Sequence, residues 1–298
     1  MARASGCVAC ASIQVGSFLR SPARSSGLPA KVLVTGKDMA LLIAPLPGHC
    51  RGGGDMDDNS ARFSPATDDV FGRVAGRYDR LCDVFSLFIH RLWKDRMARR
   101  IAVERGRELI DLASGTGDIP LRLWRRLVRR GDAADWRIRV SDISPPMLAI
   151  AETRLSHAAA RAEIMRLDAC ALDLPSGSAP LVSMAFGMKI VDRRRAMAEI
   201  YRVLEPGGVF LCLEASRIVI PGLHRLYLGY MDLCMPLIGR LATGGDASAY
   251  GYLLRGVHDF PDQKAFAAEL ESHGFVDVEW ESLSLGIVAL HRAVKPAP

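Results

Sequence analysis

The chain has 298 residues, of which 49% are hydrophobic and 24% charged, so it is long enough for one large buried core and has the composition of a globular protein. No window reaches the roughly 18 uninterrupted apolar residues of a membrane-spanning helix, so we expect no such helix. The net charge of +6 comes largely from short arginine runs on expected helices. We interpret these as solvated faces and not as a nucleic-acid surface, with anionic lipid as the alternative partner.

Residues 1–60 are rich in Ala, Ser, Gly, Arg and Pro, show no sustained periodicity, and carry Asp38 as their only acid before position 55. We predict a flexible tail here, separate from one domain over residues 61–298. Two explanations remain open. The tail is either an organelle transit peptide or the product of an upstream start codon, with Met39 or Met56 beginning the functional protein.

Cysteine usage predicts neither a disulfide framework nor a metal site. Seven cysteines are scattered along the chain, and only Cys7 and Cys10 have a C-x-x-C spacing. This pair lacks the second ligand pair that a structural zinc site needs. We therefore expect free thiols in a reducing compartment and no bound metal.

The elements follow in chain order. Apolar residues recur at three- and four-residue steps from Val70 to Leu92, which indicates an amphipathic helix. From Glu108 onward short apolar runs alternate with helical patterns, which indicates a parallel sheet covered on both faces. We expect strands at 109–113, 137–141, 163–167, 181–186, 209–214, 276–281 and 286–293, and helices at 119–130, 145–157, 193–203 and 261–273. The fold class is α/β, a doubly wound, mostly parallel seven-stranded sheet with N-terminal helices and an insertion over 215–260 before the last helix and hairpin.

A glycine-rich turn between the first strand and the next helix is the first candidate site. It runs from Asp111 through Gly115, Thr116 and Gly117 to Asp118. Glycines let the backbone pass close under a ligand, and a helix N-terminus supplies unpaired N–H groups. Such a turn also suits nucleotides, so it does not identify the ligand alone.

Two acids at the ends of the next strands favour S-adenosylmethionine. Asp142 lies at the end of the second strand, where a carboxylate can accept both hydroxyls of a ribose. Asp168 lies at the end of the third strand, where an adenine amino group would lie. The turn lacks a full G-x-G-x-x-G motif, which argues against a dinucleotide. Two acids at successive strand ends suit a cofactor that has no phosphate and carries a positive sulfonium. Each acid alone could instead be a helix cap.

Several separated blocks resemble the UbiE-type ubiquinone/menaquinone C-methyltransferases over residues 70–295. They are Val70-Phe71 with Tyr78-Asp79, Ile89 to Lys94, Asp111 to Asp118, Phe186-Gly187, Tyr201 to Gly208 and Gly286 to Arg292. The resemblance implies a Rossmann-like class I methyltransferase that transfers a methyl group from S-adenosylmethionine to a ring carbon of a polyprenylated quinol precursor. It also implies cofactor contacts at Thr116, Asp142, Asp168 and Ala169.

The chain departs from the family pattern near the reacting centre. Where the family commonly has Ser-Phe-Gly-Leu-Arg-Asn-Val, this chain has Ala185, Lys189 and Ile190 in place of the serine, arginine and asparagine. Cys82 likewise replaces an asparagine. Lysine keeps the charge of arginine without its planar fork, and isoleucine cannot hold a hydroxyl. These changes put the identity of the methyl acceptor in question.

A base, or a cation that stabilises a phenolate, is needed to make a quinol ring carbon nucleophilic. The first candidates are Tyr78, Asp83 and Lys189. His90 is an alternative that could equally pack beside a tryptophan on the helix face, and His291 is a weaker one. Tyr78 could also be an ordinary core tyrosine with a satisfied hydroxyl.

The apolar residues of the stretch 217–260 could be plain core, or a lid and groove for an isoprenoid tail that also rests on a bilayer. We expect a quinol-type ligand, peripheral membrane contact through a prenyl tail, no nucleic-acid partner and, as an open alternative, a homodimer. The location follows as cytoplasmic and peripheral to the membrane, or an organelle matrix if the tail is a transit peptide. Rival functions are a related enzyme acting on a different small molecule, and a non-enzymatic cofactor-binding subunit.

Overall fold

The structure is a computed structural model that describes residues 70–158, 160–220, 222–243 and 256–297. The predicted tail of residues 1–60 and the pair Cys7 and Cys10 lie outside the described residues. None of the helices in the described ranges is both long and apolar enough to cross a membrane.

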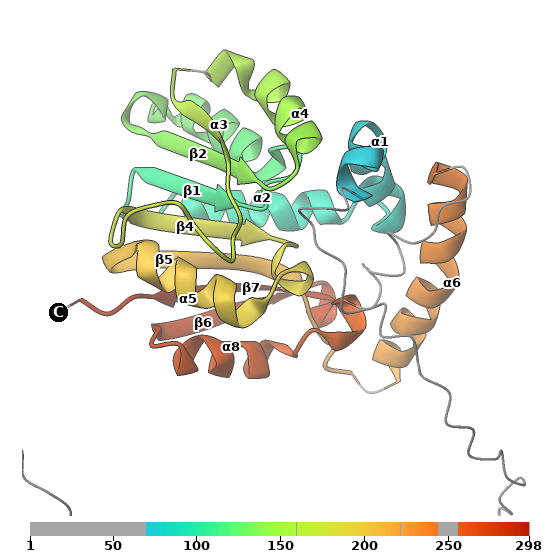
Figure 1. The fold of residues 1–298 in the computed structure, drawn as a ribbon. Helices are drawn as coiled ribbons and strands as arrows, with labels where there is room; N and C mark the ends of the chain where they lie inside the picture. Colours follow the sequence, from blue (N-terminus) through green and yellow to red (C-terminus); the bar gives the residue numbers. More distant parts are fainter. Residues whose placement is uncertain (1–69, 159, 221, 244–255, 298) are drawn as a thin grey trace, which may run out of the picture. The chain divides into compact units, whose positions relative to one another are not determined.

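A seven-stranded sheet organises the domain and has the strand order β3-β2-β1-β4-β5-β7-β6 (Figure 1). The neighbouring pairs among β1 to β5 are parallel, whereas β7 is antiparallel to both β5 and β6. The strands are β1 Glu108–Leu112, β2 Arg137–Asp142, β3 Ala162–Arg166, β4 Ala179–Ala185, β5 Leu204–Ala215, β6 Val276–Leu283 and β7 Val288–Val294. All seven predicted runs occur as strands, so the predicted fold class is confirmed.

Helices connect the strands and also precede the sheet. They are α1 Val70–Phe85, α2 His90–Ile101, α3 Asp118–Arg130, α4 Pro145–Leu155, α5 Arg193–Val203, α6 Leu223–Thr243 and α8 Gln263–Ser272. Short 3-10 turns within the described residues are η2 Ala133–Asp135, η3 Ser156–Ala158, η4 Met188–Ile190 and η5 Ser284–Gly286. The helices predicted at 119–130, 145–157, 193–203 and 261–273 are thus confirmed with small shifts at their ends.

The sheet buries a separate apolar cluster on each face. One cluster joins α2, α3 and α4 to the sheet through residues such as Met97, Leu123 and Ile138. The other joins α5 and α8 to the opposite face and includes Ile200 and Phe266. Alternate residues of a strand point to opposite faces, so a strand covered on both sides is apolar throughout, as the sequence of β5 from Val209 onward indicates.

The periodic run from Val70 to Leu92 forms two helices and not one. α1 ends at Phe85, and the backbone turns through Leu87 and Phe88, whose φ angles are 48° and 65°. The turn is closed by hydrogen bonds from the Phe88 N–H to the Asp83 carbonyl oxygen, at 2.8 Å, and from the Leu87 N–H to the Val84 carbonyl oxygen. These bonds replace the next helical turn. The break was not apparent because no glycine marks it.

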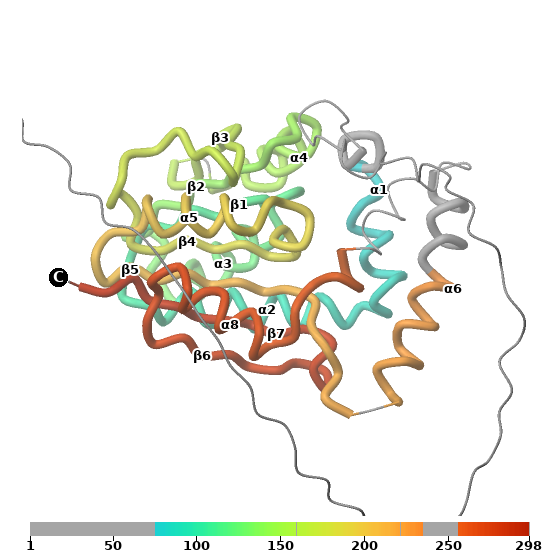
Figure 2. Tube along the Cα trace, turned by 60° about the horizontal axis from the view of Figure 1, so that its bottom comes forward, coloured from blue at the N-terminus to red at the C-terminus, as the bar shows by residue number. Residues whose placement is uncertain are grey.

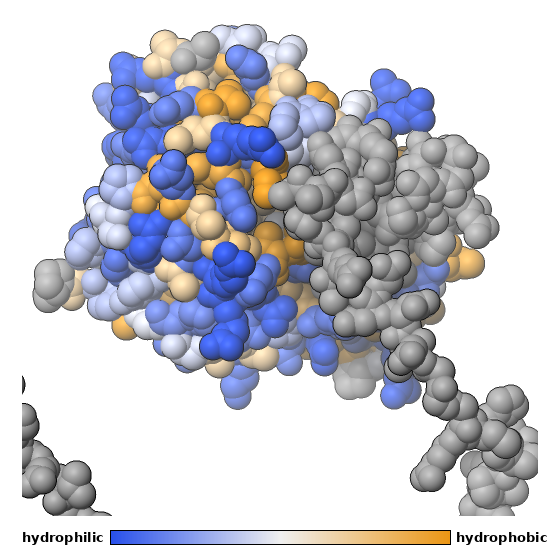
Figure 3. All heavy atoms as spheres, in the orientation of Figure 1, coloured by the Kyte–Doolittle hydropathy of each residue, from blue (hydrophilic) through white to orange (hydrophobic). Residues whose placement is uncertain are grey.

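α1 and α6 pack against each other at the carboxyl ends of the parallel strands, and both views show them there (Figures 1 and 2). In the orientation of Figure 1, hydrophilic residues dominate the left and lower parts of the coloured surface, and hydrophobic residues gather in a band nearer its centre (Figure 3). On α5, Arg194 and Arg195 are exposed, in agreement with our interpretation of that basic run as a solvated helix face.

Candidate functional site

A cavity of about 330 Å³ lies at the carboxyl ends of β1, β4 and β5. Its floor includes Ala113, Ala185 and Ala215, which are the residues at or just beyond the ends of these strands. α1, α2 and α6 supply most of the remaining walls, which are predominantly apolar. The cavity therefore occupies the position where open α/β sheets bind ligands.

The glycine-rich turn forms one wall of this cavity. Ala113, Gly115 and Gly117 have positive φ angles of 50°, 54° and 76°, and Gly117 is the residue before α3. A Cβ added to Gly115 would meet no atom within 4 Å, so open space lies over the backbone there. By contrast, a Cβ added to Gly187 would approach the Cβ of Ala113 to 2.8 Å. The turn is thus packed against Gly187 at Ala113 and open at Gly115, as a ligand-binding turn requires.

Asp142 lies beside this turn, as the sequence predicted. Its Oδ2 accepts a hydrogen bond from the Gly115 N–H at 2.8 Å, and its Oδ1 accepts one from the Ser144 N–H at 2.9 Å. These two bonds fix the plane of the carboxylate. A carboxylate can accept more than two hydrogen bonds, so the same group can also receive ribose hydroxyls.

Asp168 and Ala169 follow the end of β3, the strand next to β2. Asp168 is exposed and its Oδ1 accepts the Cys170 N–H at 2.8 Å, whereas Ala169 is buried. Neither residue lines the cavity. This hydrogen bond closes a turn, because β4 and not a helix follows β3, so the helix-cap alternative does not apply to Asp168.

Two further predicted residues are committed to internal contacts. Asp111 is buried and accepts hydrogen bonds from the hydroxyls of Ser114 and Ser183. Burial raises the pKa of its carboxyl to about 6, although these hydroxyls act in the opposite direction. The Thr116 hydroxyl donates to Asp79 Oδ1 at 2.9 Å and accepts from Arg154 at 2.8 Å. Thr116 therefore ties the turn to α1 and α4 through its side chain.

Of the three predicted catalytic residues, Tyr78 and Lys189 line the cavity. The pKa of the Tyr78 phenol is raised well above its ordinary value, first by the neighbouring Cys82 and then by burial. This hydroxyl therefore stays protonated and can donate a hydrogen bond, which makes it a poor general base.

Lys189 forms a buried ion pair with Glu214, a residue that our sequence reasoning missed. The Lys189 Nζ lies 2.9 Å from Glu214 Oε1 and donates to the Phe186 carbonyl oxygen at 2.6 Å. The side chains are only 7% and 1% exposed. Glu214 also accepts the N–H groups of Lys189 and Ala215. The available signal was an acid that follows the apolar run of residues 209–213.

Asp83, the third predicted catalytic residue, does not line the cavity. Its two oxygens accept hydrogen bonds from Arg91 at 2.6 Å each, and these bonds lower the pKa of the carboxyl. Its nearest link to the cavity is His90, whose Nε2 lies 3.7 Å from Asp83 Oδ1. Asp83 is therefore not placed to contact a substrate, and it can act only through a neighbouring residue.

His90 lines the cavity, whereas His291 is buried in the sheet with its Nε2 3.0 Å from the Gln263 carbonyl oxygen. Burial lowers the pKa of both histidines to about 4, so both imidazoles are neutral near pH 7. His90 Nδ1 lies 2.6 Å from the hydroxyl of Ser86, a second cavity residue that the sequence did not single out.

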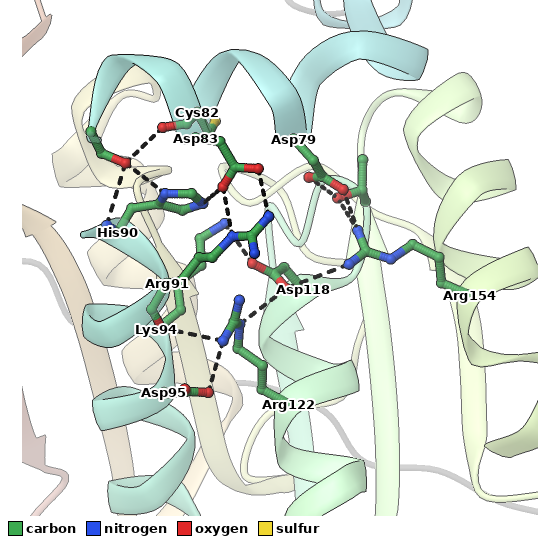
Figure 4. A network of polar contacts seen from close by, with 12 residues as sticks. Asp79, Cys82, Asp83, His90, Arg91, Lys94, Asp95, Asp118, Arg122 and Arg154 are labelled. Carbon is green, nitrogen blue, oxygen red and sulfur yellow. Dashed lines mark hydrogen bonds and ion pairs between the residues drawn. The ribbon is translucent and has the colours of Figure 1, made fainter. Parts of the chain in front are cut away.

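A network of charges joins the first four helices beside the cavity (Figure 4). Asp118 is its centre, with Lys94 Nζ at 3.0 Å and Arg122 Nε at 3.1 Å. Burial alone would raise the pKa of Asp118, but these cations hold it at about 2. Arg154 links the same carboxylate to Asp79 on α1. Within the described residues, no group of three or more His, Cys, Asp or Glu could hold a metal ion.

Comparison with known proteins gives a consistent result. Residues 56–295 match the model of the ubiE/COQ5 methyltransferase family. A relative from Methylobacterium nodulans, "Ubiquinone/menaquinone biosynthesis C-methyltransferase UbiE", is 40% identical over 81% of this chain and 94% of its own length. The mitochondrial "2-methoxy-6-polyprenyl-1,4-benzoquinol methylase" of Arabidopsis thaliana is 36% identical over 85% of this chain and 93% of its own.

Among solved structures, a SAM-dependent methyltransferase from Thermotoga maritima, described as a possible histamine N-methyltransferase, superposes with a TM-score of 0.54. It is 17% identical, and the match covers 76% of this chain and 98% of that one. At this identity the likeness concerns the fold alone.

Proposed function

Because the chain belongs to the ubiE/COQ5 methyltransferase family, we propose that it methylates a ring carbon of a polyprenylated benzoquinol with S-adenosylmethionine as methyl donor. The proposal rests on the observation that a glycine-rich turn and apolar walls belong to the same cavity. The glycine-rich turn at Gly115 forms one wall, and apolar residues such as Phe85 and Met231 form others. A polar donor and an apolar acceptor can therefore meet there. The product belongs to ubiquinone or menaquinone biosynthesis, as the names of the relatives suggest for those proteins.

The site fits the donor. S-adenosylmethionine supplies an electrophilic methyl group on a positively charged sulfur. Asp142 and Asp168 present carboxylates at adjacent strand ends, and the open backbone at Gly115 leaves room for a ligand. Calorimetric binding of S-adenosylmethionine to Asp142→Ala is the direct test of this assignment.

The residues of the chain contribute mainly orientation, exclusion of water and placement of charge. The predominantly apolar walls keep water from the acceptor. Lys189 uses two of its three ammonium protons on Phe186 and Glu214, so the third can reach a ring oxygen that gains negative charge. Tyr78 lines the cavity from the α1 side and can help to orient the ring.

The departure at Lys189 and Ile190 supports one alternative, a related enzyme that methylates a different small molecule. Lys189 lines the cavity and Ile190 does not. If the acceptor is a quinol, Lys189→Arg with Ile190→Asn should keep or raise turnover, because arginine can hold a phenolate with two hydrogen bonds. Methyl transfer by wild type and double variant to demethylated quinols and to extracts of the source cell is the measurement. A wild type that methylates no quinol, even with a short tail and detergent present, would reject the quinol proposal.

We further propose that the cavity mouth rests on a lipid surface, where a prenyl tail can enter. Leu87, Phe88 and Leu285 are 68%, 57% and 62% exposed and all have positive φ angles. Leu87 lines the cavity, and the turn of Leu285 is joined to α2 by a 2.8 Å hydrogen bond from Trp93 to Ser284. Large apolar side chains held outward on strained backbone favour a hydrophobic contact.

Vesicle flotation tests this contact. The double variant Leu87→Ser with Phe88→Ser should float less with phospholipid vesicles than the wild type. Val103→Ser, which removes a similarly exposed valine after α2, should float as the wild type does. Equal binding by all three proteins would contradict the proposal. The location that follows is peripheral to a membrane, in the cytoplasm or, if residues 1–60 act as a transit peptide, in an organelle matrix. Fractionation of the source cell decides between these.

A further inference from the structure

Ser86, His90 and Asp83 form a chain of polar groups that begins at the cavity and ends at a fixed carboxylate. Ser86 lines the cavity, and its hydroxyl lies 2.6 Å from His90 Nδ1. The other ring nitrogen, Nε2, lies 3.7 Å from Asp83 Oδ1. Figure 4 shows the His90 ring directed toward Asp83, with Arg91 below that carboxylate in this view. The cavity wall at Ser86 is thus connected to the buried Asp83 carboxylate through the two nitrogens of the His90 ring.

We propose that Ser86, His90 and Asp83 are a proton relay that takes the hydroxyl proton of the methyl acceptor while the ring carbon receives its methyl group. Ser86 is the residue that touches the acceptor, and His90 and Asp83 act through it. The inference rests on the proposed function only in taking the acceptor to carry a ring hydroxyl.

The position of Asp83 selects the tautomer that the relay needs. A proton on His90 Nε2 faces the Asp83 carboxylate, whereas a lone pair there would be repelled by it. Nδ1 then carries the lone pair and accepts the Ser86 hydroxyl proton. The Cys82 carbonyl oxygen, 2.7 Å from the Ser86 hydroxyl, is the competing acceptor and already receives the Ser86 N–H. The hydroxyl can therefore turn to His90 without leaving that carbonyl unpaired.

Methyl transfer to the ring is coupled to proton transfer along the relay. The bond between the sulfonium sulfur and the methyl carbon breaks, its electron pair stays on sulfur, and a ring electron pair forms the new carbon–carbon bond. The acceptor hydroxyl loses its proton to Ser86 Oγ, and its electron pair forms a carbonyl with the ring. Ser86 passes its own proton to His90 Nδ1. The ring carbon then releases its hydrogen to water, the carbonyl oxygen takes a proton back from Ser86, and His90 returns its proton to Ser86. One proton is released overall.

A weak base is sufficient for this step, because the hydroxyl becomes a strong acid as the ring loses electron density to the new bond. The neutral state of His90 near pH 7 therefore makes it ready to accept a proton. Asp83 on α1 stabilises the imidazolium, while Lys94 on α2 opposes it. The Lys94 charge is paired with Asp118 on α3, Arg91 is paired with Asp83, and Arg122 is paired with Asp95 and Asp118. Cys82 supplies the remaining titratable group near the relay.

Single-turnover methylation of a short-chain benzoquinol tests the relay. Ser86→Ala and His90→Gln should each slow methyl transfer by about 100-fold or more, while donor affinity by calorimetry changes by less than about threefold. Ser86→Thr keeps a hydroxyl and should retain most of the rate. His273→Gln, the same substitution at the end of α8 outside the cavity wall, should behave as wild type.

The pH profile separates a proton role from a structural one. Between about pH 7 and pH 9 the wild-type rate should be nearly flat, whereas that of His90→Gln should rise by up to about tenfold per pH unit as solvent replaces the relay. Rates of Ser86→Ala and His90→Gln within about threefold of wild type, or a flat His90→Gln profile, would overturn the proposal.

Nitrogen NMR of the histidine ring gives a result that does not depend on the acceptor. The relay requires the His90 proton on Nε2 and an Nδ1 shift that changes in Ser86→Ala. A proton on Nδ1 in the wild type would overturn the relay even if quinols are methylated. Failure of the wild type to methylate any quinol, with the expected tautomer observed, would instead reject the quinol function and leave the relay supported.

Discussion

Lys189 and Glu214 form a 2.9 Å ion pair in the cavity wall, with one partner supplied by the turn after β4 and the other by β5. Lys189→Met should lower the free energy of unfolding by about 3–5 kcal/mol, because Glu214 would remain charged in an almost fully buried position. Lys189→Arg should lower the free energy of unfolding much less, because arginine keeps the positive charge. Urea denaturation measures both.

Arg96→Met is the matched control for this prediction. Arg96 pairs with Glu281 at 2.8 Å, but the two side chains are 47% and 43% exposed. Its removal should change stability by less than about 1 kcal/mol, since water screens such a pair. If Lys189→Met and Arg96→Met lower the free energy of unfolding equally, burial does not increase the contribution of the Lys189–Glu214 pair to stability.

Asp142→Ala should weaken the binding of S-adenosylmethionine at least about tenfold, because each charge-assisted hydrogen bond contributes about 1.5–3 kcal/mol. The structure adds a second cause, since Asp142 also holds the N–H groups of Gly115 and Ser144. Asp135→Ala removes an exposed acid from η2 and should leave the affinity unchanged. Unchanged calorimetric affinity in folded Asp142→Ala would sink the assignment.

Stability should depend on pH through three buried groups. The pKa values of His90 and His291 are about 4 in the folded chain, against 6.5 for the free side chain. Between these values the unfolded chain binds more protons, so stability falls as the pH drops from about 6.5 to 4, by about 2 kcal/mol for each histidine. Asp111 acts oppositely, because its folded pKa of about 6 exceeds the ordinary 3.8 and the folded chain takes up its proton first.

Thermal unfolding from pH 7 to pH 4 checks the signs of these contributions. His291→Asn should make the acid decline shallower, and Asp111→Asn should make it steeper. A slope that is the same in the wild type and both variants would contradict the pH dependence argued here.

A chain that starts at Met56 should melt within a few degrees of the full chain and keep its turnover. The family match begins at residue 56, and the composition of the preceding residues offers little apolar surface to bury. Differential scanning calorimetry and methyl transfer by the two proteins are the measurements. Loss of solubility or of donor binding would show that residues 1–55 belong to the catalytic domain.

The sequence predicts the sheet well because each strand carries its signal within a few residues. The apolar runs of β1 and β4, with a glycine-rich turn after the first, need no knowledge of distant contacts. β5 begins at Leu204, five residues before the predicted start, because Leu204 pairs with Ala179 across a register shift. Pro206 and the two glycines after it therefore lie within that strand.

The site was predicted less completely because its chemistry depends on pairs far apart in the chain. Asp83 looks like a catalytic acid until Arg91 is placed against it across the turn between α1 and α2. Glu214 shows no partner in the sequence, and its role appears only when β5 places it beside Lys189. Positions such as Asp142 were predictable because strand order alone puts them at one edge.

The antiparallel β7 lies between β5 and β6, although it is the last strand in the chain. Until Val288–Val294 has left the ribosome, β5 has an open edge, and β6 cannot join the sheet at all. A nascent or C-terminally shortened chain therefore exposes unpaired backbone along Leu211 and its neighbours, a template for aggregation. Closure of this edge of β5 therefore waits for a strand that lies far from it in the chain.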